Sequence, residues 1–397
     1  MNSVEGNIII YLHTNDRQVN HVHIQNQRNL AASKVLLGKS VDQATQMVPL
    51  LFSLCSTAQT CVAVAAIEQA TNIEIDEQTR AQRAALVRME TLREQIWRVL
   101  IDWPWFIGEP ANHRALQQVI QICEKYKQLL APQQQQLKPG GHPNLDHSLE
   151  SKIDDLQRQL SSILEQNVFA LPLKAWLELQ TINNLIHWSA RRETSSARLI
   201  SHLQAMDWEQ SGKCPILPIP VMDSERLHYA LQLEHFIQKP RWHDRCHETG
   251  NIARCSSELI KSLQREFGNG LLTRLTVRLT EVAQLTQRMA DLSTDQTSDV
   301  FLDNDEQLEM GTGLAHIMAA RGQLTHQVKV ANDVIQNYKI LAPTEWNFHP
   351  EGVVASSLSS LTGKQKEIEL QTRLLINCVD PCVGYQLHIT EKEPQYA

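Results

Sequence analysis

Apolar residues recur at helical spacing through most of this 397-residue chain, and this periodicity constrains the fold more than any other feature. In the segment 77–101 the spacing places a broad apolar stripe along one side of a long helix. The proline of Asp102-Trp103-Pro104-Trp105 is expected to end that helix. Other helices are predicted over the ranges 35–52, 58–69, 115–130, 149–164, 171–188, 197–206, 225–236, 256–267 and 271–292. The pattern predicts a mostly α-helical protein.

Small β elements are predicted near both ends of the chain. A β-branched run at 7–13 and an alternating run at 19–24 flank a turn-like sequence, which is typical of a hairpin. The range 323–341 mixes β-branched residues with an Asn332-Asp333 turn and predicts a second hairpin.

The domain organisation is expected to be simple. No internal repeat is visible, and the length allows one large core, so we expect a single domain spanning residues 1–397. Polar stretches around 131–147 and 292–309 predict flexible loops within it. The segment 214–220 carries three prolines and should be extended.

Composition limits the classes of function. The net charge of −7 argues against a nucleic-acid binder, which would carry a basic face. No apolar run approaches the roughly 20 residues of a membrane span, so no membrane insertion is expected. The first residues lack the basic and apolar regions of a secretory signal. Eight cysteines are too few for a disulfide scaffold in a chain of this length, which favours reduced thiols in the cytoplasm.

Two thiol-bearing stretches are candidates for chemistry. Near the C-terminus, Cys378 and Cys382 lie four positions apart and His388 follows six residues later. Thiolate and imidazole suit iron, nickel, copper or zinc. Cys55 lies just before a predicted helix, where the helix dipole is expected to lower its thiol pKa. The simpler interpretation of any free cysteine is a small, buried hydrophobic residue. We interpret five of them in this way: Cys61, Cys123, Cys214, Cys246 and Cys255.

Two histidine clusters give weaker signals. His21 and His23 share one face of the second predicted strand, where a solvated surface is the simpler interpretation. His243, Cys246 and His247 are close in sequence but lack the second half that a zinc site needs.

The sequences of the two thiol-bearing stretches resemble motifs of nickel–iron hydrogenase large subunits. Asp380-Pro381-Cys382-x-x-Tyr385-x-x-His388 is similar to their C-terminal motif, with Tyr385 in place of a second cysteine. The N-terminal motif is similar around Cys55, which matches its second cysteine, and Gln59, which matches a histidine or glutamine position. Phe52 stands where that motif has its first cysteine. Each motif therefore keeps one cysteine of two.

Four more segments extend the resemblance to nearly the whole chain. They are 4–7 (VEGN), 248–254 (ETGNIAR), 319–326 (AARGQLTH) and 343–347 (PTEWN), in the order that the family has. Each segment alone is a weak signal, and six motifs in the correct order are a strong one. The resemblance implies a hydrogenase-large-subunit-like helical fold.

The resemblance also implies roles for individual residues. In the family, four thiolates hold nickel and iron, and the iron carries cyanide and carbon monoxide. Cys55 matches a bridging ligand and Cys382 a terminal nickel ligand, so a stable four-sulfur nickel site is not expected here. Arg321 matches the arginine over the cyanide ligands, and Thr344 a hydroxyl that donates to a second cyanide.

Three further residues are candidates with less support. Glu5 matches a proton-relay glutamate, and His388 matches a histidine that borders the metal core. Cys378 has no counterpart in the motif but is placed to supply a replacement thiol near Cys382.

A large-subunit-like chain that has lost half of its cysteines resembles the HupK/HoxV group of hydrogenase expression/formation proteins. This implies a cytoplasmic maturation scaffold without catalytic activity, which holds the iron–dicyanide–carbonyl unit transiently between Cys55 and Cys382. Its partners would be maturation chaperones and the hydrogenase large subunit. Two alternatives stay open: a divergent catalytic or hydrogen-sensing large subunit, and a metal-free mimic of the large subunit that binds maturation chaperones.

Overall fold

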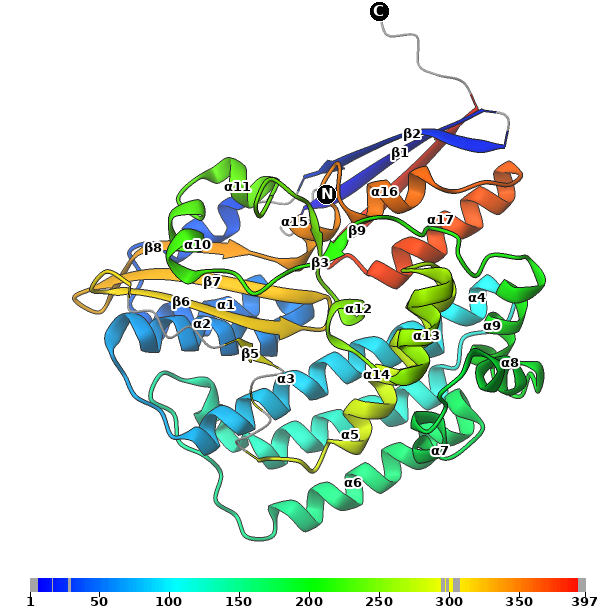
Figure 1. The fold of residues 1–397 in the computed structure, drawn as a ribbon. Helices are drawn as coiled ribbons and strands as arrows, with labels where there is room; N and C mark the ends of the chain where they lie inside the picture. The colour runs from blue at the N-terminus through cyan, green and yellow to red at the C-terminus, as the bar shows by residue number, and fades with distance from the viewer. Residues whose placement is uncertain are drawn as a thin grey trace, which may run out of the picture.

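The computed structural model describes residues 6–15, 17–27, 30–293, 297, 300–302 and 308–391. Its centre is a group of four long helices, each of which contacts two of the others, in the order α3, α5, α6, α14 and back to α3 (Figure 1). They are α3 (Glu77–Trp97), α5 (His113–Leu130), α6 (Leu149–Leu164) and α14 (Leu271–Gln287). The predicted helical character of the chain is confirmed.

Helix α3 is enclosed on nearly all sides. It begins at the cap Asp76, whose side chain accepts from the Gln78 amide. Its predicted apolar stripe is buried, and so are polar residues on its other faces, including Arg83, Glu90 and Glu94. A buried ion pair joins Arg83 to Glu68 at 2.7 Å. The centre of the molecule therefore contains charges that must find partners inside the protein.

A four-stranded antiparallel sheet lies beside the helices, in the order β5 (Phe301–Leu302), β6 (Thr312–Ala319), β7 (Gly322–Ala331) and β8 (Val334–Leu341). The predicted second hairpin is β7 and β8, and its turn residues Asn332 and Asp333 have φ values of 52° and 60°. Helix α2 (Ser56–Thr71) packs on β6 and β7 (Figure 1). Their approach depends on Gly313, because a Cβ there would lie 1.8 Å from the Ala66 carbonyl oxygen.

A second sheet joins the two ends of the chain. The predicted N-terminal hairpin is formed by β1 (Asn7–Asn15) and β2 (Gln18–Asn26), which pair antiparallel. The C-terminal strand β9 (Gly384–Thr390) pairs parallel with β1 on its other edge. Ile8, Ile10 and Leu12 point from β1 into the core. This pairing fixes the C-terminal motif against the start of the chain (Figure 1).

The remaining elements are mostly shorter. They include the helices α1 (Val41–Leu51), α9 (Ser195–Ala205), α12 (Asn251–Arg254), α13 (Glu258–Phe267), α15 (Pro343–Asn347), α16 (Val353–Ser359) and α17 (Gln365–Val379). Tighter 3-10 turns cover Leu30–Leu36, Ser53–Cys55 and Pro132–Leu137, and π turns cover Arg98–Asp102 and Glu165–Phe169. Strands β3 (Leu217–Pro218) and β4 (His247–Glu248) pair with each other.

Several predicted boundaries were wrong. The segment 171–188 is two helices, α7 (Leu173–Leu177) and α8 (Ile182–Ala190), because Thr181 forms a capping box that starts a new helix. The segment 225–236 likewise divides into α10 (Ser224–Ala230) and α11 (Glu234–Gln238). Pro104 does not end the helical path, since a π turn lets it enter the first turn of α4 (Trp103–Phe106), where its missing N–H is not needed. Strands β6 and β9 and helices α16 and α17 were not predicted.

Two further features concern the predicted loops and the surface. The segment 131–147 is attached to α3, because Arg83 donates to the Gln136 and Lys138 carbonyl oxygens and Gln82 donates to that of Asn144. Much of 292–309 lies outside the described residues.

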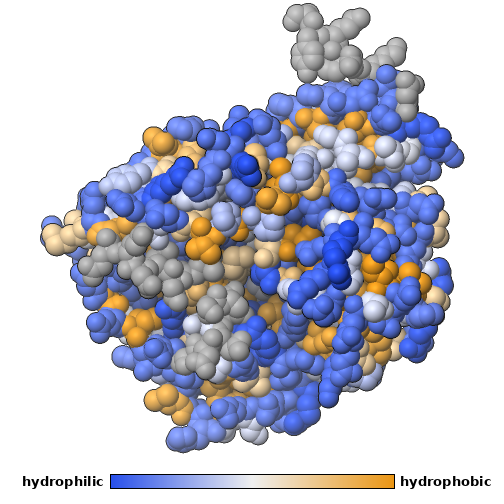
Figure 2. Space-filling view, in the orientation of Figure 1, coloured by the Kyte–Doolittle hydropathy of each residue, from blue (hydrophilic) through white to orange (hydrophobic). Residues whose placement is uncertain are grey.

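Among the described residues no single helix has the length and apolar character to cross a membrane, although the sharply bent pair of Val41–Leu51 and Ser53–Thr71 together meets those criteria. The face seen in Figure 2 is mostly hydrophilic, with scattered hydrophobic groups.

Candidate functional site

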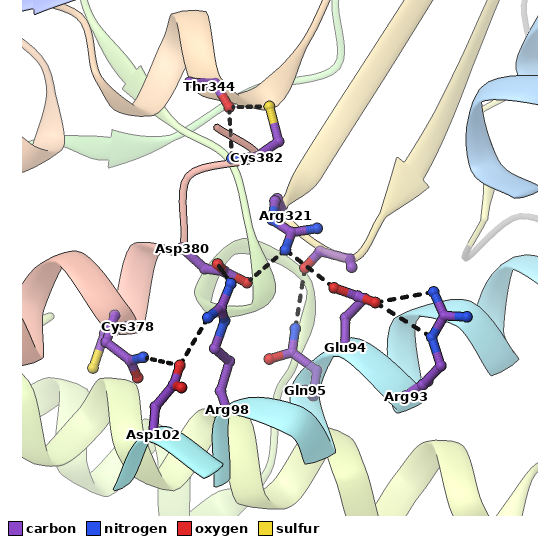
Figure 3. A network of polar contacts seen from close by, with 12 residues as sticks. Arg93, Glu94, Gln95, Arg98, Asp102, Arg321, Thr344, Cys378, Asp380 and Cys382 are labelled. Atoms are coloured by element: carbon purple, nitrogen blue, oxygen red, sulfur yellow. Dashed lines mark hydrogen bonds and ion pairs between the residues drawn. The ribbon is translucent and has the colours of Figure 1, made fainter. Parts of the chain in front are cut away.

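Cys382 lies in the short segment between helix α17 and strand β9. Its sulfur is 2.9 Å from the hydroxyl oxygen of Thr344, at the start of α15, and its backbone N–H donates to the same oxygen at 3.4 Å (Figure 3). Because the hydroxyl accepts the N–H, its own hydrogen is free to point at the sulfur. The Thr344 side chain is buried and Cys382 is half-buried. The sulfur is thereby held in one position beside a hydrogen-bond donor.

Cys55 lies directly before α2 at the end of a chain of buried hydrogen bonds. The side-chain amide nitrogen of Gln59 donates to the Cys55 sulfur at 3.6 Å, and the side-chain oxygen of Gln59, Oε1, accepts from His326 Nε2 at 2.9 Å. His326 Nδ1 is 2.8 Å from the Tyr338 hydroxyl. Since Nε2 must donate to the carbonyl oxygen, Nδ1 accepts from Tyr338, so every donor in the chain is directed toward the sulfur. Burial lowers the pKa of His326 to about 3, which keeps the ring neutral.

The Cys55 thiol has a raised pKa, which overturns the sequence-based expectation. Burial raises the pKa of Cys55 to about 12, with further contributions from the Glu90 carboxylate and the Cys382 thiol, while Arg321 and Gln59 act in the opposite direction. Glu90 also accepts hydrogen bonds from the Thr57 and Ala58 amides. The N-terminus of α2 is therefore already occupied by a carboxylate, which opposes the effect of the helix dipole on the thiol.

Arg321 lies in the turn between β6 and β7, and its guanidinium points toward Glu94 and Asp380 (Figure 3). One of its terminal nitrogens, Nη2, is 3.1 Å from Glu94 and 3.4 Å from Asp380. Burial opposes its charge, but Asp380 and Glu94, with smaller contributions from Cys382 and Cys55, outweigh that effect and raise the pKa of Arg321. Arg321 is 5% exposed, yet its Nε and Nη1 have no hydrogen-bond partner. Two buried donors are thus left unused beside the two thiols.

Asp380 is the centre of the charge network around Arg321. It ends α17 in the left-handed conformation, at φ 61°, and its carboxylate lies 2.7 Å from Arg98. Burial alone would raise the pKa of Asp380, but Arg321, Arg98 and Arg278 outweigh it and hold the pKa below its ordinary value. The carboxylate is therefore charged and fixes the end of α17 next to the Arg321 turn.

The sequence motifs meet in space through Asn347. Its side-chain amide accepts from the Thr249 N–H at 2.9 Å and donates to the carbonyl oxygens of Thr249 and Arg321. The Thr249 hydroxyl in turn accepts from the Gln323 N–H at 2.6 Å. Gly322 is needed in this turn, since its φ is 128° and a Cβ would lie within 2.8 Å of Thr249 atoms. Three motif segments thus form the frame that positions Arg321.

The structure brings Cys55, Cys382, Arg321 and Thr344 together, but not the other candidates. The Cys378 sulfur points away from Cys382 (Figure 3), and the backbone carbonyl oxygen of Cys378 accepts from Arg278 at 2.8 Å. His388 is exposed on β9, where its ring stacks on Tyr11 with 5.1 Å between ring centroids. Glu5 lies outside the described residues.

The weaker histidine clusters do not assemble into metal sites either. His243 is beside Arg226, His247 contacts the backbone of Pro218 and Trp242, and Cys246 is 3.3 Å from His349 instead. His21 and His23 are exposed on β2, as the sequence indicated. Within the described part of the chain, no three His, Cys, Asp or Glu side chains form a group that could hold a metal ion.

A cleft of about 730 Å³ opens next to Cys382. One wall is the segment from Arg98 to Phe106, and the other is formed by the end of α17 and the start of β9. Leu54 and Trp105 also line the cleft and are 37% and 58% exposed, so the cleft opens to solvent. Tyr385, which stands where the similar hydrogenase motif has its second cysteine, is another lining residue and hydrogen-bonds to Arg373.

Sequence reasoning missed the acidic partners of the site. Glu90 and Glu94 lie on α3, on faces that the helical pattern assigned to solvent. The only signal in the sequence was the large number of charged residues in this helix. When other elements enclose such a helix, its charged side chains must form ion pairs inside the protein. Asp380 and Asn347 belong to motifs that were noted, but their partners Arg98, Arg278 and Thr249 could not be inferred from spacing.

The arrangement fits a soft, anionic metal group better than a bare divalent ion. Two sulfurs are suitable ligands for low-valent iron. A buried, charged guanidinium with two unpaired N–H groups suits an anion bound to that iron, such as cyanide. With Phe52 and Tyr385 in place of the other two thiols, these positions offer no four-sulfur nickel site.

Comparison with known proteins places these features among hydrogenase-related chains. The family model of nickel-dependent hydrogenase matches residues 256–388. The hydrogenase expression/formation protein HoxV of Cupriavidus necator is 28% identical over 93% of this chain and 93% of its own length. HupV of Azotobacter chroococcum and HupK of Rhizobium leguminosarum, which carry the same expression/formation description, are each 24% identical over at least 93% of both chains.

The fold is that of hydrogenase large subunits. The Ni-Fe-Se hydrogenase of D. vulgaris Hildenborough aligns over 94% of this chain and 98% of its own, with a TM-score of 0.65 and 15% identity. The enzyme of Dm. baculatum aligns over 93% and 94%, with a TM-score of 0.67 and 14% identity. The predicted hydrogenase-large-subunit-like fold is confirmed, and the similarity to HupK and HoxV proteins extends over nearly the whole chain.

Proposed function

We propose that this chain, a relative of hydrogenase expression/formation proteins with a large-subunit-like fold, is a maturation scaffold for nickel–iron hydrogenase. In this proposal it carries the iron–dicyanide–carbonyl unit between Cys55 and Cys382 and passes it to the hydrogenase large subunit. Nickel is not part of the cargo, and the chain does not itself turn over hydrogen. Maturation chaperones would supply the iron unit, and we propose the cytoplasm as the place of transfer.

One observation carries the proposal: Arg321 has two buried, unpartnered N–H groups, and its charge acts to lower the pKa of the Cys55 thiol against the effect of burial. Leaving such donors unpaired costs roughly 1–3 kcal/mol each, which favours an acceptor that binds there in the working protein. Cyanide on iron is an anionic acceptor of this kind. The Thr344 hydroxyl beside Cys382 is a second donor in the same place, although here it contacts the sulfur.

The number of sulfurs suits a carrier rather than an enzyme. A closed four-ligand site holds its metal permanently, whereas a site with two protein ligands leaves coordination positions for exchange. The chain keeps two of the family's four thiols and the arginine, while Tyr385 is engaged with Arg373. This combination supports transient binding of iron.

The test is to produce the chain together with the hydrogenase maturation machinery and to purify it without oxygen. Infrared spectroscopy is expected to show cyanide and carbonyl stretching bands, and metal analysis to show iron without nickel. Cys55→Ser and Cys382→Ser should each weaken the bands and lower the yield of mature hydrogenase. Cys246→Ser is the matched control, because Cys246 is also half-buried but lies beside His349, away from the site.

The alternatives give different results in the same experiment. One nickel per chain would favour a divergent catalytic or hydrogen-sensing large subunit. Absence of the bands, with hydrogenase maturation unchanged in both cysteine variants, would favour a metal-free mimic that binds maturation chaperones.

A further inference from the structure

We propose that the iron unit enters and leaves through the cleft beside Cys382, so that Cys382 is the exchanging ligand and Cys55 the anchoring ligand. This inference rests on the proposed function, since it assigns an order to the two thiols of that site. Both cysteines are half-buried, so the inference follows from their different surroundings: Cys382 lines an open cleft, whereas Cys55 lies outside that cleft and accepts a hydrogen bond from Gln59.

The cleft gives direct access to only one of the two cysteines. Cys382 is a lining residue of the 730 Å³ space, whereas Cys55 is not among its lining residues, although its neighbour Leu54 is. Leu54 and Trp105 line the cleft with exposed side chains. Asn377 on one wall donates to Asp102 on the other at 2.8 Å, which joins the walls. A group that enters through this cleft therefore meets Cys382 before Cys55.

The two sulfurs also differ in how they are held. Cys382 lies outside helices and strands and is held by one side chain, Thr344, among the described residues. Cys55 precedes α2, a helix that packs on the four-stranded sheet, and its sulfur accepts from Gln59, which His326 fixes in turn. A ligand that must bind and let go is better placed on the Cys382 segment, and a ligand that retains the iron is better placed at Cys55.

The exchange is chemically balanced without any redox partner. The donor is a protein that holds the iron unit on a thiolate. Attack by the Cys382 sulfur forms one iron–sulfur bond and breaks the donor's iron–sulfur bond, and the proton of the Cys382 thiol goes to the departing thiolate. Cys55 then binds the same iron by displacing a second donor ligand, which leaves with the proton of the Cys55 thiol. Delivery to the large subunit is the same exchange in reverse, with the acceptor's thiol as the incoming group. Iron keeps its oxidation state throughout.

Access can be tested on the metal-free chain by alkylation with iodoacetamide, followed peptide by peptide with mass spectrometry. Cys382 should react faster than Cys55 in the native protein. Trp105→Ala widens the cleft and should raise the rate at Cys382 several-fold while leaving that of Cys55 unchanged. Trp97→Ala is the matched control, because Trp97 is another exposed tryptophan, at 42%, and does not line the cleft.

A second variant should lower the alkylation rate at Cys382, and this decrease cannot be explained by unfolding. Gly384 lines the cleft, and a Cβ there would meet only an Asn7 side-chain oxygen at 3.7 Å. Gly384→Phe is therefore expected to fit, to narrow the cleft and to lower the rate at Cys382. Unfolding cannot slow alkylation, so the two variants together isolate the effect of access. The proposal would be overturned if Cys55 were alkylated faster than Cys382. It would also be overturned if the alkylation rate at Cys382 were the same in both variants as in the native chain.

The loaded chain provides the second readout. In excess dithiothreitol, the cyanide and carbonyl bands should decay faster in Trp105→Ala, more slowly in Gly384→Phe and at the native rate in Trp97→Ala. Cys55→Ser should capture the unit and lose it during gel filtration, whereas Cys382→Ser should not capture it. Normal loading of Cys382→Ser contradicts the order proposed here. Absence of bands in the native chain contradicts the proposed function itself, and the alkylation rates still report on access.

Discussion

Arg321 and Asp380 face each other across 3.4 Å, between the turn that joins β6 to β7 and the residue that ends α17. Both residues are 5% exposed, and this pair ties the arginine of one motif to the aspartate of another. Asp380 also binds Arg98, so one carboxylate stabilises the positive charges around the thiols. The integrity of the site should therefore depend on this single carboxylate.

Replacement of Asp380 by asparagine should destabilise the fold strongly. Asparagine tolerates the left-handed backbone, but the change leaves Arg321 and Arg98 without their shared buried carboxylate, which costs about 3–5 kcal/mol. Asp102→Asn is the control, because Asp102 pairs with the same Arg98 but is about a quarter exposed, and we expect a loss of about 1 kcal/mol or less. Urea denaturation measures both, and equal losses would contradict this account.

Asp380 also predicts a pH dependence. Its pKa is lower in the folded chain than the ordinary value of about 4, so its contribution to stability is complete above that value. The contribution should then decline as the pH falls through the lowered pKa. Unfolding free energies measured between neutral pH and acid should show a decline in the native chain that is smaller in Asp380→Asn. Parallel curves would exclude a role for this carboxylate.

Replacement of Arg321 by lysine should separate the charge from the hydrogen bonds. Lysine keeps one positive charge near Glu94 and Asp380 but lacks the Nε and Nη1 donors. We expect a folded chain that retains much less of the cyanide and carbonyl bands. Arg274→Lys is the control, because Arg274 forms another buried ion pair, with Glu248, and its replacement is expected to affect folding to a comparable extent. Retention of full bands in Arg321→Lys would show that its free donors do not bind the cargo.

Removal of the Tyr338 hydroxyl should disturb the hydrogen bonds that lead to Cys55. Tyr338→Phe leaves His326 Nδ1 buried without its donor, which costs about 1–2 kcal/mol and frees the orientation of Gln59. We expect a shift of the infrared bands in the loaded chain. Tyr126→Phe removes another buried hydroxyl, which donates to Met289, and should lower stability similarly without a band shift. Shifts in both variants, or in neither, would argue against the relay.

Glu90 should control the acidity of Cys55. Glu90→Gln removes a carboxylate that helps to raise the pKa of Cys55 to about 12. Alkylation requires the thiolate, so at a fixed alkaline pH the rate at Cys55 should increase, by about tenfold for each unit that the pKa falls. Cys123 is an internal control, since burial raises its pKa to about 12 without a contribution from Glu90. A rate at Cys55 that does not change would assign its acidity to burial alone.

The sequence determined most of the long helices, the two hairpins and the identity of the motifs. Periodicity found α3, α5 and α6 because each has a continuous apolar stripe, and turn residues such as Asn332 and Asp333 marked the second hairpin. The order of six motifs indicated the fold class and directed attention to Cys55, Cys382, Arg321 and Thr344, which the structure brings together. These are properties of local spacing and residue identity, which a chain carries before it folds.

Only the tertiary structure decided how those residues are surrounded. The polar faces of α3 are packed rather than solvated, so Glu90 and Glu94 became partners of the site, and the thiol of Cys55 became less acidic instead of more. The parallel pairing of β9 with β1 placed His388 on the exposed face, and the end of α17 turned the Cys378 sulfur away. Burial and long-range pairing depend on every other element. The polar face of an amphipathic helix can be covered by water or by a neighbouring helix, and the sequence pattern is the same in both cases.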